Sequence, residues 1–195
     1  AITKELPSLL KAYAAAGSDA RMNGCELPVV INSGSGNQGL TVSVPLIVYA
    51  EREHLDKEKL YRALVISNLT AIHLKTEIGR LSAFCGAVSA GAACGAGLAY
   101  LKDASEEVMN HTIVNALAIT SGIICDGAKA SCAAKIAVSV EAGILGYDMY
   151  MNGQQFYGGD GIISKGIENT IHNIGVLGSQ GMASTDQEII KIMCE

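Results

Sequence analysis

Apolar residues recur every three or four positions over most of the chain, which is the spacing of one face of an α-helix. The clearest segment covers residues 57–78, where four apolar residues recur at helical spacing: Leu60, Leu64, Leu69 and Ile72. No segment has the alternation of apolar and polar residues that is typical of a half-buried strand. The pattern therefore predicts an all-α, multi-helix fold.

Turn-forming residues separate further helical segments. We predict these helices over residues 4–17, 40–50, 80–101, 108–124, 130–149, 165–177 and 184–194. Asp103 with Glu106, and Ser184 with Gln187, have the spacing of a capping box at a helix start. Glycine-rich turns connect the helices, and a length of 195 residues fits a single domain.

The most glycine-rich of these turns precedes the predicted helix at residue 40. It reads Asn32-Ser33-Gly34-Ser35-Gly36-Asn37-Gln38-Gly39. Free backbone N–H groups and the positive end of the helix dipole favour an anion at such a place, either a carboxylate or a phosphate. The alternative is a plain Gly/Ser turn between two helices.

Composition narrows the class of protein. The net charge is −5 and the chain has no cluster of Lys and Arg, so nucleic-acid binding is not expected.

Residues 81–101 carry no charge and include Gly91-x-x-x-Gly95, a pattern found in membrane helix pairs. They are mostly Ala, Gly, Ser and Cys, which insert poorly into membranes, so we expect a buried helix of a soluble protein. No signal peptide is recognisable, so we expect a cytoplasmic location. The sequence begins without a Met, so we expect either a processed chain or part of a longer protein.

The six cysteines suggest metal ligands or buried thiols, because we expect no disulfides in a cytoplasmic chain and no CxxC pair exists. Cys85 and Cys125 each lie beside a glycine near a predicted helix end, where a side chain can point into a cavity. Cys132 would lie roughly 10 Å from Cys125 along a continuous helix, so it joins them only if the chain folds back at Asp126-Gly127. Cys25 is close to the glycine-rich turn.

The remaining candidate ligands are less distinctive. Cys94 is expected to fill the core, and Cys194 is the penultimate residue. The four histidines show no HxxxH or HExxH spacing, so each is expected at the surface or paired in the core.

Several segments, in the same order along the chain, resemble one family. Residues 21–39, beginning Arg21-Met22-Asn23-Gly24, are followed by Ser82-Ala83-Phe84-Cys85-Gly86-Ala87-Val88 and then by Gly122-Ile123-Ile124-Cys125-Asp126-Gly127. Together they resemble the iron–sulfur L-serine dehydratase alpha domain, and most closely its L-cysteine desulfidase branch. The tail from Gly166 to Met193 is similar to that branch as well.

The resemblance implies a mostly helical catalytic domain with a [4Fe–4S] cluster, one iron of which is open to substrate. Cys85 and Cys125 match two of the cluster ligands. The third is unsettled: the serine dehydratase pattern places it at Ile136, where Cys132 is the nearest thiol, and Cys25 and Cys194 are further candidates. In the desulfidase branch the third ligand lies near the start of a chain about twice this length. Residues 1–195 would then be a single domain, either the C-terminal part of a longer chain or one subunit.

The implied reaction is the elimination of water or sulfide from L-serine or L-cysteine, which gives pyruvate and ammonia. An open iron would act as Lewis acid, and the turn would hold the substrate carboxylate through residues Asn32, Ser33, Gly34, Ser35, Gly36, Asn37 and Gln38. The base stays open among Lys75, His73, His172 and Lys129. The implied partners are an amino-acid substrate and a missing N-terminal half or beta-type subunit, and we expect a homo-oligomer. An isolated half would fold yet lack the cluster and activity.

Two other functions are compatible with parts of the pattern. In pyridoxal-phosphate (PLP) dehydratases a similar turn binds phosphate, but these enzymes require alternating βα units and a Schiff-base lysine, neither of which is recognisable here. A non-catalytic helical interaction domain, or a membrane-associated one, would use the Ala/Gly faces as contacts between copies.

Overall fold

The computed structural model describes residues 2–195, with side chains from residue 5 onward. Within this range lie eight α-helices: α1 (Ile2–Met22), α2 (Gly36–Arg52), α3 (Lys57–Ile78), α4 (Gly86–Leu101), α5 (Glu106–Thr120), α6 (Cys132–Met151), α7 (Ile167–Val176) and α8 (Ala183–Cys194). A π-helical turn, Leu177–Gly181, joins α7 to α8. Residues 2–195 contain two isolated β-bridges but no strand, so the predicted all-α fold is confirmed.

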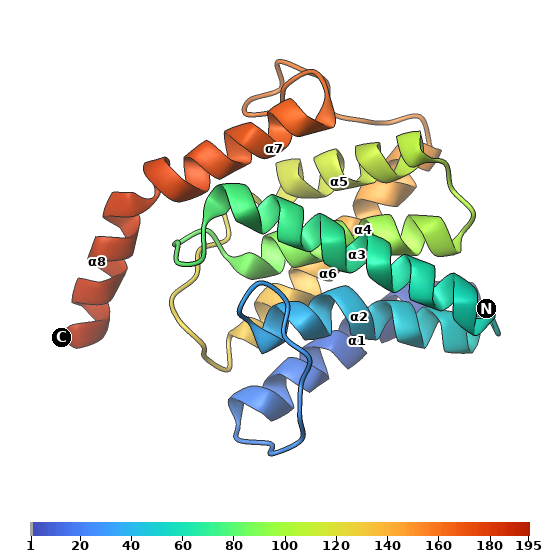
Figure 1. Cartoon of the computed structure of the whole chain (residues 1–195), viewed down its shortest axis with the longest axis horizontal. Coiled ribbons are helices and arrows are strands. Elements are labelled where there is room, and N and C mark those ends of the chain that lie inside the picture. Colours follow the sequence, from blue (N-terminus) through green and yellow to red (C-terminus); the bar gives the residue numbers. More distant parts are fainter. Residues whose placement is uncertain (1) are drawn as a thin grey trace.

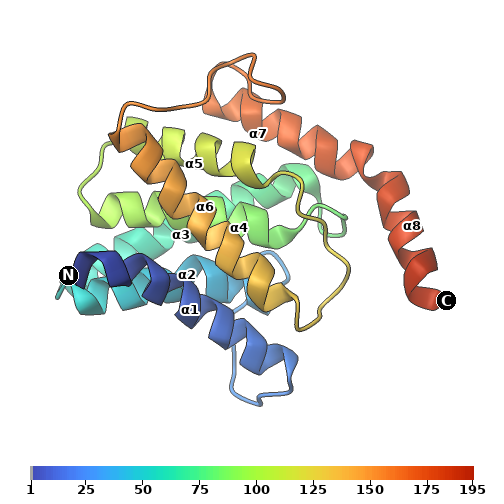
Figure 2. The same cartoon turned by 180° about the vertical axis from the view of Figure 1, so that it is seen from behind.

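Helix α4 lies at the centre of the bundle and contacts α2, α3, α5 and α6 (Figures 1 and 2). All of its residues except Gly86 and Tyr100 are buried. This confirms that the uncharged segment is an interior helix, although the predicted start at residue 80 was wrong. The chain turns before α4 because the Ser82 hydroxyl accepts a hydrogen bond from the Phe84 N–H and donates one to the Gly178 carbonyl, which holds residues 82–85 in a loop.

Glycine allows α4 and α6 to approach backbone to backbone. A Cβ atom added to Gly91 would lie 2.3 Å from the carbonyl oxygen of Ser139, and one added to Gly143 would lie 2.5 Å from the carbonyl oxygen of Gly91. The Gly91-x-x-x-Gly95 pattern therefore serves packing inside one chain. Over the described part of the chain, no helix has both the length and the apolarity to cross a membrane.

Several helix starts and ends differ from the prediction: α2 begins at Gly36, inside the predicted glycine-rich turn and not at residue 40, and α5 ends at Thr120 and not at residue 124. Helix α1 continues past Gly17 and ends at Met22. Gly17 does not end the helix because it packs against Leu40: a Cβ atom added to Gly17 would lie 3.4 Å from the Leu40 side chain. Helix α5 is capped by Ser105, whose hydroxyl accepts from the Val108 N–H, and not by Asp103.

Asp103 instead has a φ of 60° in the turn after α4, which excludes it as the cap. The predicted box at Ser184 lies inside α8, which begins at Ala183 without a side-chain cap. The physical reason is that α8 continues from α7 through the π-helical turn, so the helix does not start afresh. Helix α8 extends away from the bundle (Figures 1 and 2) and none of its residues is buried.

The close contact at Gly91 predicts how a substitution there changes the free energy of unfolding. Gly91→Ala should lower the free energy of unfolding by about 1–3 kcal/mol, because the new methyl group meets a backbone oxygen that cannot move alone. This loss should outweigh the better helix propensity of alanine. Chemical denaturation followed by circular dichroism measures it. The control is Gly122→Ala, where an added Cβ has no neighbour within 4 Å and stability should stay the same. Equal stability of the two variants would contradict the packing described here.

Candidate functional site

Two loops that each carry a cysteine are joined by backbone hydrogen bonds. The Cys85 N–H donates to the Ile123 carbonyl at 3.2 Å, and the Cys125 N–H donates to the Ala83 carbonyl at 2.6 Å. These bonds form the isolated antiparallel bridge between Phe84 and Ile124. Residues forty positions apart in the sequence therefore lie side by side.

The two thiols share a hydrogen bond, and their acidities diverge because of it. The bond to Cys125, together with burial, raises the pKa of the Cys85 thiol. The same bond lowers the pKa of Cys125 to about 6, and the backbone N–H of Gly127 and the charge of Lys135 add to this effect. This shift favours the thiolate form of Cys125, which is the form that binds metals.

The chain folds back after Cys125 and brings a third thiol to the same place. Gly127 has a φ of 92°, which favours glycine, and the Cys132 thiol at the start of α6 lies 3.7 Å from the Gly127 carbonyl oxygen. Cys132 and Cys125 line one cavity. Because the chain breaks at Asp126-Gly127, Cys125 and Cys132 are not held apart as they would be along a continuous helix.

The glycine-rich turn forms a tight hairpin in front of α2. Asn32 and Ser35 exchange two backbone hydrogen bonds, of 3.1 and 3.0 Å, across Ser33 and Gly34, both of which have positive φ. The Ser35 hydroxyl then caps α2 by accepting from the Gln38 N–H at 3.4 Å. In the described part of the chain the N–H groups of Gly36 and Asn37 have no acceptor, so both remain available at the helix N-terminus.

Two contacts hold this turn against the cysteine loops and α1. Gln38 packs over Gly86, where an added Cβ would lie 2.6 Å from the Gln38 amide nitrogen. The Arg21 side chain packs over Gly36 in the same way, and it donates a hydrogen bond of 3.2 Å to the side-chain oxygen of Asn37. The side-chain oxygen of Gln38, a residue only 6% exposed, has no hydrogen-bond partner among the described residues. A buried amide oxygen without a partner favours a bound donor.

The turn and the three thiols line one cavity of about 300 Å³ at one end of the bundle, where the three loops meet in Figure 1. Its charged lining residues are all cations: Arg21, Lys75, Arg80 and Lys135. No carboxylate lines it within the described chain, although the whole protein carries a net charge of −5. The cavity is therefore suited to anionic groups, thiolates and carboxylates alike.

Lys75 is the cation most enclosed by protein. It is 7% exposed, and within residues 2–195 its amino group makes no hydrogen bond or ion pair. Burial lowers the pKa of Lys75 below its ordinary value, although Cys125, Cys85 and Asp186 nearby oppose the shift. This lysine lines the cavity that also holds Cys85 and the Ser33 turn.

The other candidates from the sequence lie outside this cavity. His73 and His172 are exposed on the surface, where they pair with Glu168 and Glu77. Lys129 and the cysteines at 25 and 194 are exposed as well, and Cys94 is buried in the core as expected. The cations Arg21, Arg80 and Lys135 were missed by sequence reasoning, because no periodicity or spacing connects them.

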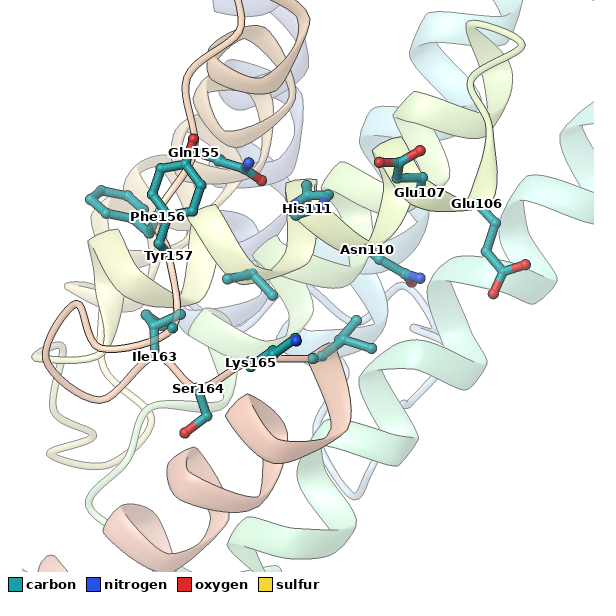
Figure 3. A pocket seen from close by; sticks show the side chains of 14 residues that line it. Glu106, Glu107, Asn110, His111, Gln155, Phe156, Tyr157, Ile163, Ser164 and Lys165 are labelled. Atoms are coloured by element: carbon teal, nitrogen blue, oxygen red, sulfur yellow. The ribbon is translucent and has the colours of Figure 1, made fainter.

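A second, larger cavity lies between α5 and the segment 152–166. It has a volume of about 620 Å³, and Figure 3 shows Glu107, His111 and Lys165 among its polar side chains. No cysteine lines it. The smaller cavity is therefore the candidate site, because only there do thiols, a helix N-terminus and a buried lysine meet.

Comparison with known families covers nearly the whole chain. The family described as serine dehydratase alpha chain matches residues 1–191, which include every lining residue of the thiol cavity. The chain belongs to the serine dehydratase alpha chain family. In this member of the family, Cys85, Cys125 and the glycine-rich turn are the segments that the sequence resemblance had marked.

Curated relatives are considerably longer than the chain. A UPF0597 protein of Desulfitobacterium hafniense is 68% identical over 183 residues, covering 94% of this chain and 43% of that protein. UPF0597 proteins of Lachnoclostridium phytofermentans and Finegoldia magna are 58% and 55% identical, covering 44% and 45% of their length. The chain thus spans less than half the length of these relatives. No solved structure matches it.

The resemblance implies an iron–sulfur cluster, and the cavity can be tested for its fit. Two thiols in hydrogen-bond contact, one of them with a lowered pKa, and four lining cations suit a thiolate-bound, anionic cluster. A complete set is not assembled: residues 2–195 hold no group of three His, Cys, Asp or Glu side chains placed to bind a metal ion. The donor set therefore fits two ligands, with Cys132 as a third thiol in the same cavity wall.

The coupled thiols predict a pH profile for the metal-free chain. Alkylation of Cys125 by iodoacetamide should reach half its maximal rate near pH 6, because the thiolate forms as pH rises through its lowered pKa of about 6. Cys85→Ala removes the hydrogen bond that stabilises this thiolate, so the midpoint should move to higher pH. Mass spectrometry of alkylated peptides gives the rates, and Cys94, whose pKa burial raises to about 12, should stay unmodified. An unchanged midpoint in Cys85→Ala would show that the two thiols do not interact.

Proposed function

We propose that this chain carries the substrate-binding and part of the cluster-binding machinery of an iron–sulfur lyase that eliminates water or sulfide from L-serine or L-cysteine. The supporting observation is the meeting, in one cationic cavity, of the paired thiols of Cys85 and Cys125 with the free N–H groups at the start of α2. Family membership gives this chemistry its context.

The start of α2 is the place for the substrate carboxylate. The free N–H groups of Gly36 and Asn37 and the dipole of the helix favour a negative charge there, and the Arg21 guanidinium lies against Gly36. The unpartnered side-chain oxygen of Gln38 then accepts from the substrate ammonium group. The turn residues that line the cavity, Ser33, Gly34, Ser35, Asn37 and Gln38, thereby bind both ends of an α-amino acid, whereas Asn32 lies outside the cavity with its amide on Asn68.

Cys85 and Cys125 would hold the [4Fe–4S] cluster. The third ligand is either Cys132 or a thiol from the part of the protein that the chain does not cover. Cys25 and Cys194 do not line the cavity, although Met193, next to Cys194, lies 3.5 Å from a Cβ atom added to Gly127. When bound, the cluster supplies a Lewis acid that draws electron density from the leaving group or the carboxylate. Lys135, which also pairs with Asp126, stabilises the thiolate form of Cys125 through its charge.

Lys75 removes the α-proton in this proposal. It faces the same cavity as the thiols and the turn, whereas His73 and His172 lie outside it. Removal of the α-proton and loss of hydroxide or hydrosulfide from the β-carbon leave an enamine, which tautomerises and hydrolyses to pyruvate and ammonia. Partial burial of Lys75 keeps a larger fraction of its amine neutral and able to accept a proton.

The complete enzyme includes more than this chain. A further half of the same polypeptide, or a beta-type subunit, would complete the ligand set, because the relatives are more than twice as long as the matched region. The expected homo-oligomer stays a prediction. A pyridoxal-phosphate enzyme would also use the Ser33–Gly39 turn, but the thiols facing the turn and the absence of βα units from residues 2–195 favour the iron–sulfur reaction.

The cluster assignment predicts the iron content of variants. Cys85→Ala and Cys125→Ala should each lose the iron and acid-labile sulfide that the unaltered protein takes up on anaerobic reconstitution, since each removes one thiolate ligand. The protein used is this chain produced together with the complementary region of the Desulfitobacterium hafniense relative. Cys94→Ala, which alters a cysteine outside the cavity, should keep its iron, and Ser35→Ala should keep iron while raising KM. Full iron content in both ligand variants would refute the assignment.

The role of Lys75 is tested by turnover. Lys75→Met should lower kcat by roughly 10²–10⁴-fold without changing iron content, because it removes the base but no ligand. The matched control is Lys102→Met, since Lys102 is also partly buried with a lowered pKa but lies over the Tyr147 ring outside the thiol cavity. Pyruvate formation from serine and cysteine measures both. Activity in Lys75→Met equal to that of the control would assign the base elsewhere.

A further inference from the structure

One side of the protein exposes a row of large apolar side chains. Its members are 45% to 80% exposed: Val30, Ile31, Tyr61, Val65, Leu69 and Ile72. We call this surface the α3 face. Soluble proteins rarely expose so many large apolar side chains together unless something binds there.

The six residues form one continuous surface although they come from two segments. Tyr61, Val65, Leu69 and Ile72 follow helical spacing and share one side of α3. The loop before α2 is tied to that side, because the Asn32 amide donates to the backbone and side-chain oxygens of Asn68 at 3.2 and 3.0 Å. In Figure 1 α3 crosses the front of the molecule.

Helix α3 has apolar residues on two sides. One side packs against the rest of the bundle, and the other is the α3 face. Leu74 and Ile78 are buried on the inner side, where α2, α4 and α7 contact α3. A surface helix has one apolar side and one polar side, whereas a helix that is apolar on both is covered on both. The described chain covers only the inner side of α3.

We propose that the α3 face is the docking surface for the part of the protein that the UPF0597 relatives have in addition to the region matched here. That part makes up more than half of each relative, since the chain covers 43% to 45% of their length. It is thus large enough to cover a face of this size. A second copy of this chain is the other occupant, which the experiment below distinguishes.

The α3 face leads directly to the thiol cavity. Ile72 lines a hollow together with Ser33, Lys75 and Arg80, and these three also line the cavity of Cys85 and Cys125. Leu81, at the edge of this cavity, is 95% exposed. A polypeptide docked on the α3 face therefore reaches the cavity mouth. There it would exclude water from the cavity and place a further cluster ligand. This last step rests on the proposed function, whereas the docking itself does not.

Co-production of this chain with the complementary region of the Desulfitobacterium hafniense relative tests the docking. The tagged chain should retain the complementary region on purification and elute with it as one complex. The double variant Val65→Asp/Leu69→Asp should retain it roughly tenfold less or worse, because two carboxylates would be buried without partners. The matched control is Val138→Asp/Leu145→Asp, the same exchange at exposed positions of α6. It should bind as the unaltered chain does.

Circular dichroism and melting temperature establish that both double variants fold, so that lost binding is not lost structure. Equal retention by the two variants would overturn the proposal, as would failure of the unaltered chain to retain the complementary region. Dissociation of a self-associated chain by Val65→Asp/Leu69→Asp, with the complementary region still bound, would assign the α3 face to a second copy instead. None of these readouts involves iron or turnover, so a failed docking test is separable from a failed lyase assignment.

Discussion

Close packing around α4 is the constraint on which the other features depend. Four helices contact α4, and contacts as near as those of Gly91 and Gly143 require a helix with almost no side-chain bulk. The same helix begins at Gly86, directly after Cys85, so its position fixes the first cysteine at the end of the bundle. The start of α2 and the start of α6 come to that end because both helices pack alongside α4.

The site is built from helix ends and the loops between them. This gives it free N–H groups at α2, a thiol that precedes α4 and another that begins α6, all within one cavity. Because the core beneath is tightly packed, these groups are held by a rigid base while their loops remain reachable from solvent. The electrostatics follow the same logic: four cations gather where thiolates and a carboxylate would need them, in a protein that is acidic as a whole.

Two features of this chain are incomplete by themselves. The greater length of the relatives offers one explanation for both. The cavity brings two cysteines together and a third close by without forming a complete metal site in the described chain, and the α3 face remains apolar on its outer side. Both features lie on one side of the molecule and share residues around Lys75 and Arg80. A single additional polypeptide, docked at the α3 face, would account for both.

Local sequence was sufficient for the helical fold, for most helix centres and for the glycine-rich turn at the start of α2, because helical periodicity and turn residues act over a few positions. It also marked Cys85 and Cys125 through a resemblance over several segments. It misplaced the starts of α4, α5 and α8, because caps and loops there are decided by contacts such as that of Ser82 with Gly178. Only the tertiary structure could bring Arg21, Lys75 and Lys135 to the thiols and leave His73 outside. These residues are far apart in sequence, and the packing that decides which side of each helix faces the cavity is not encoded in any single segment.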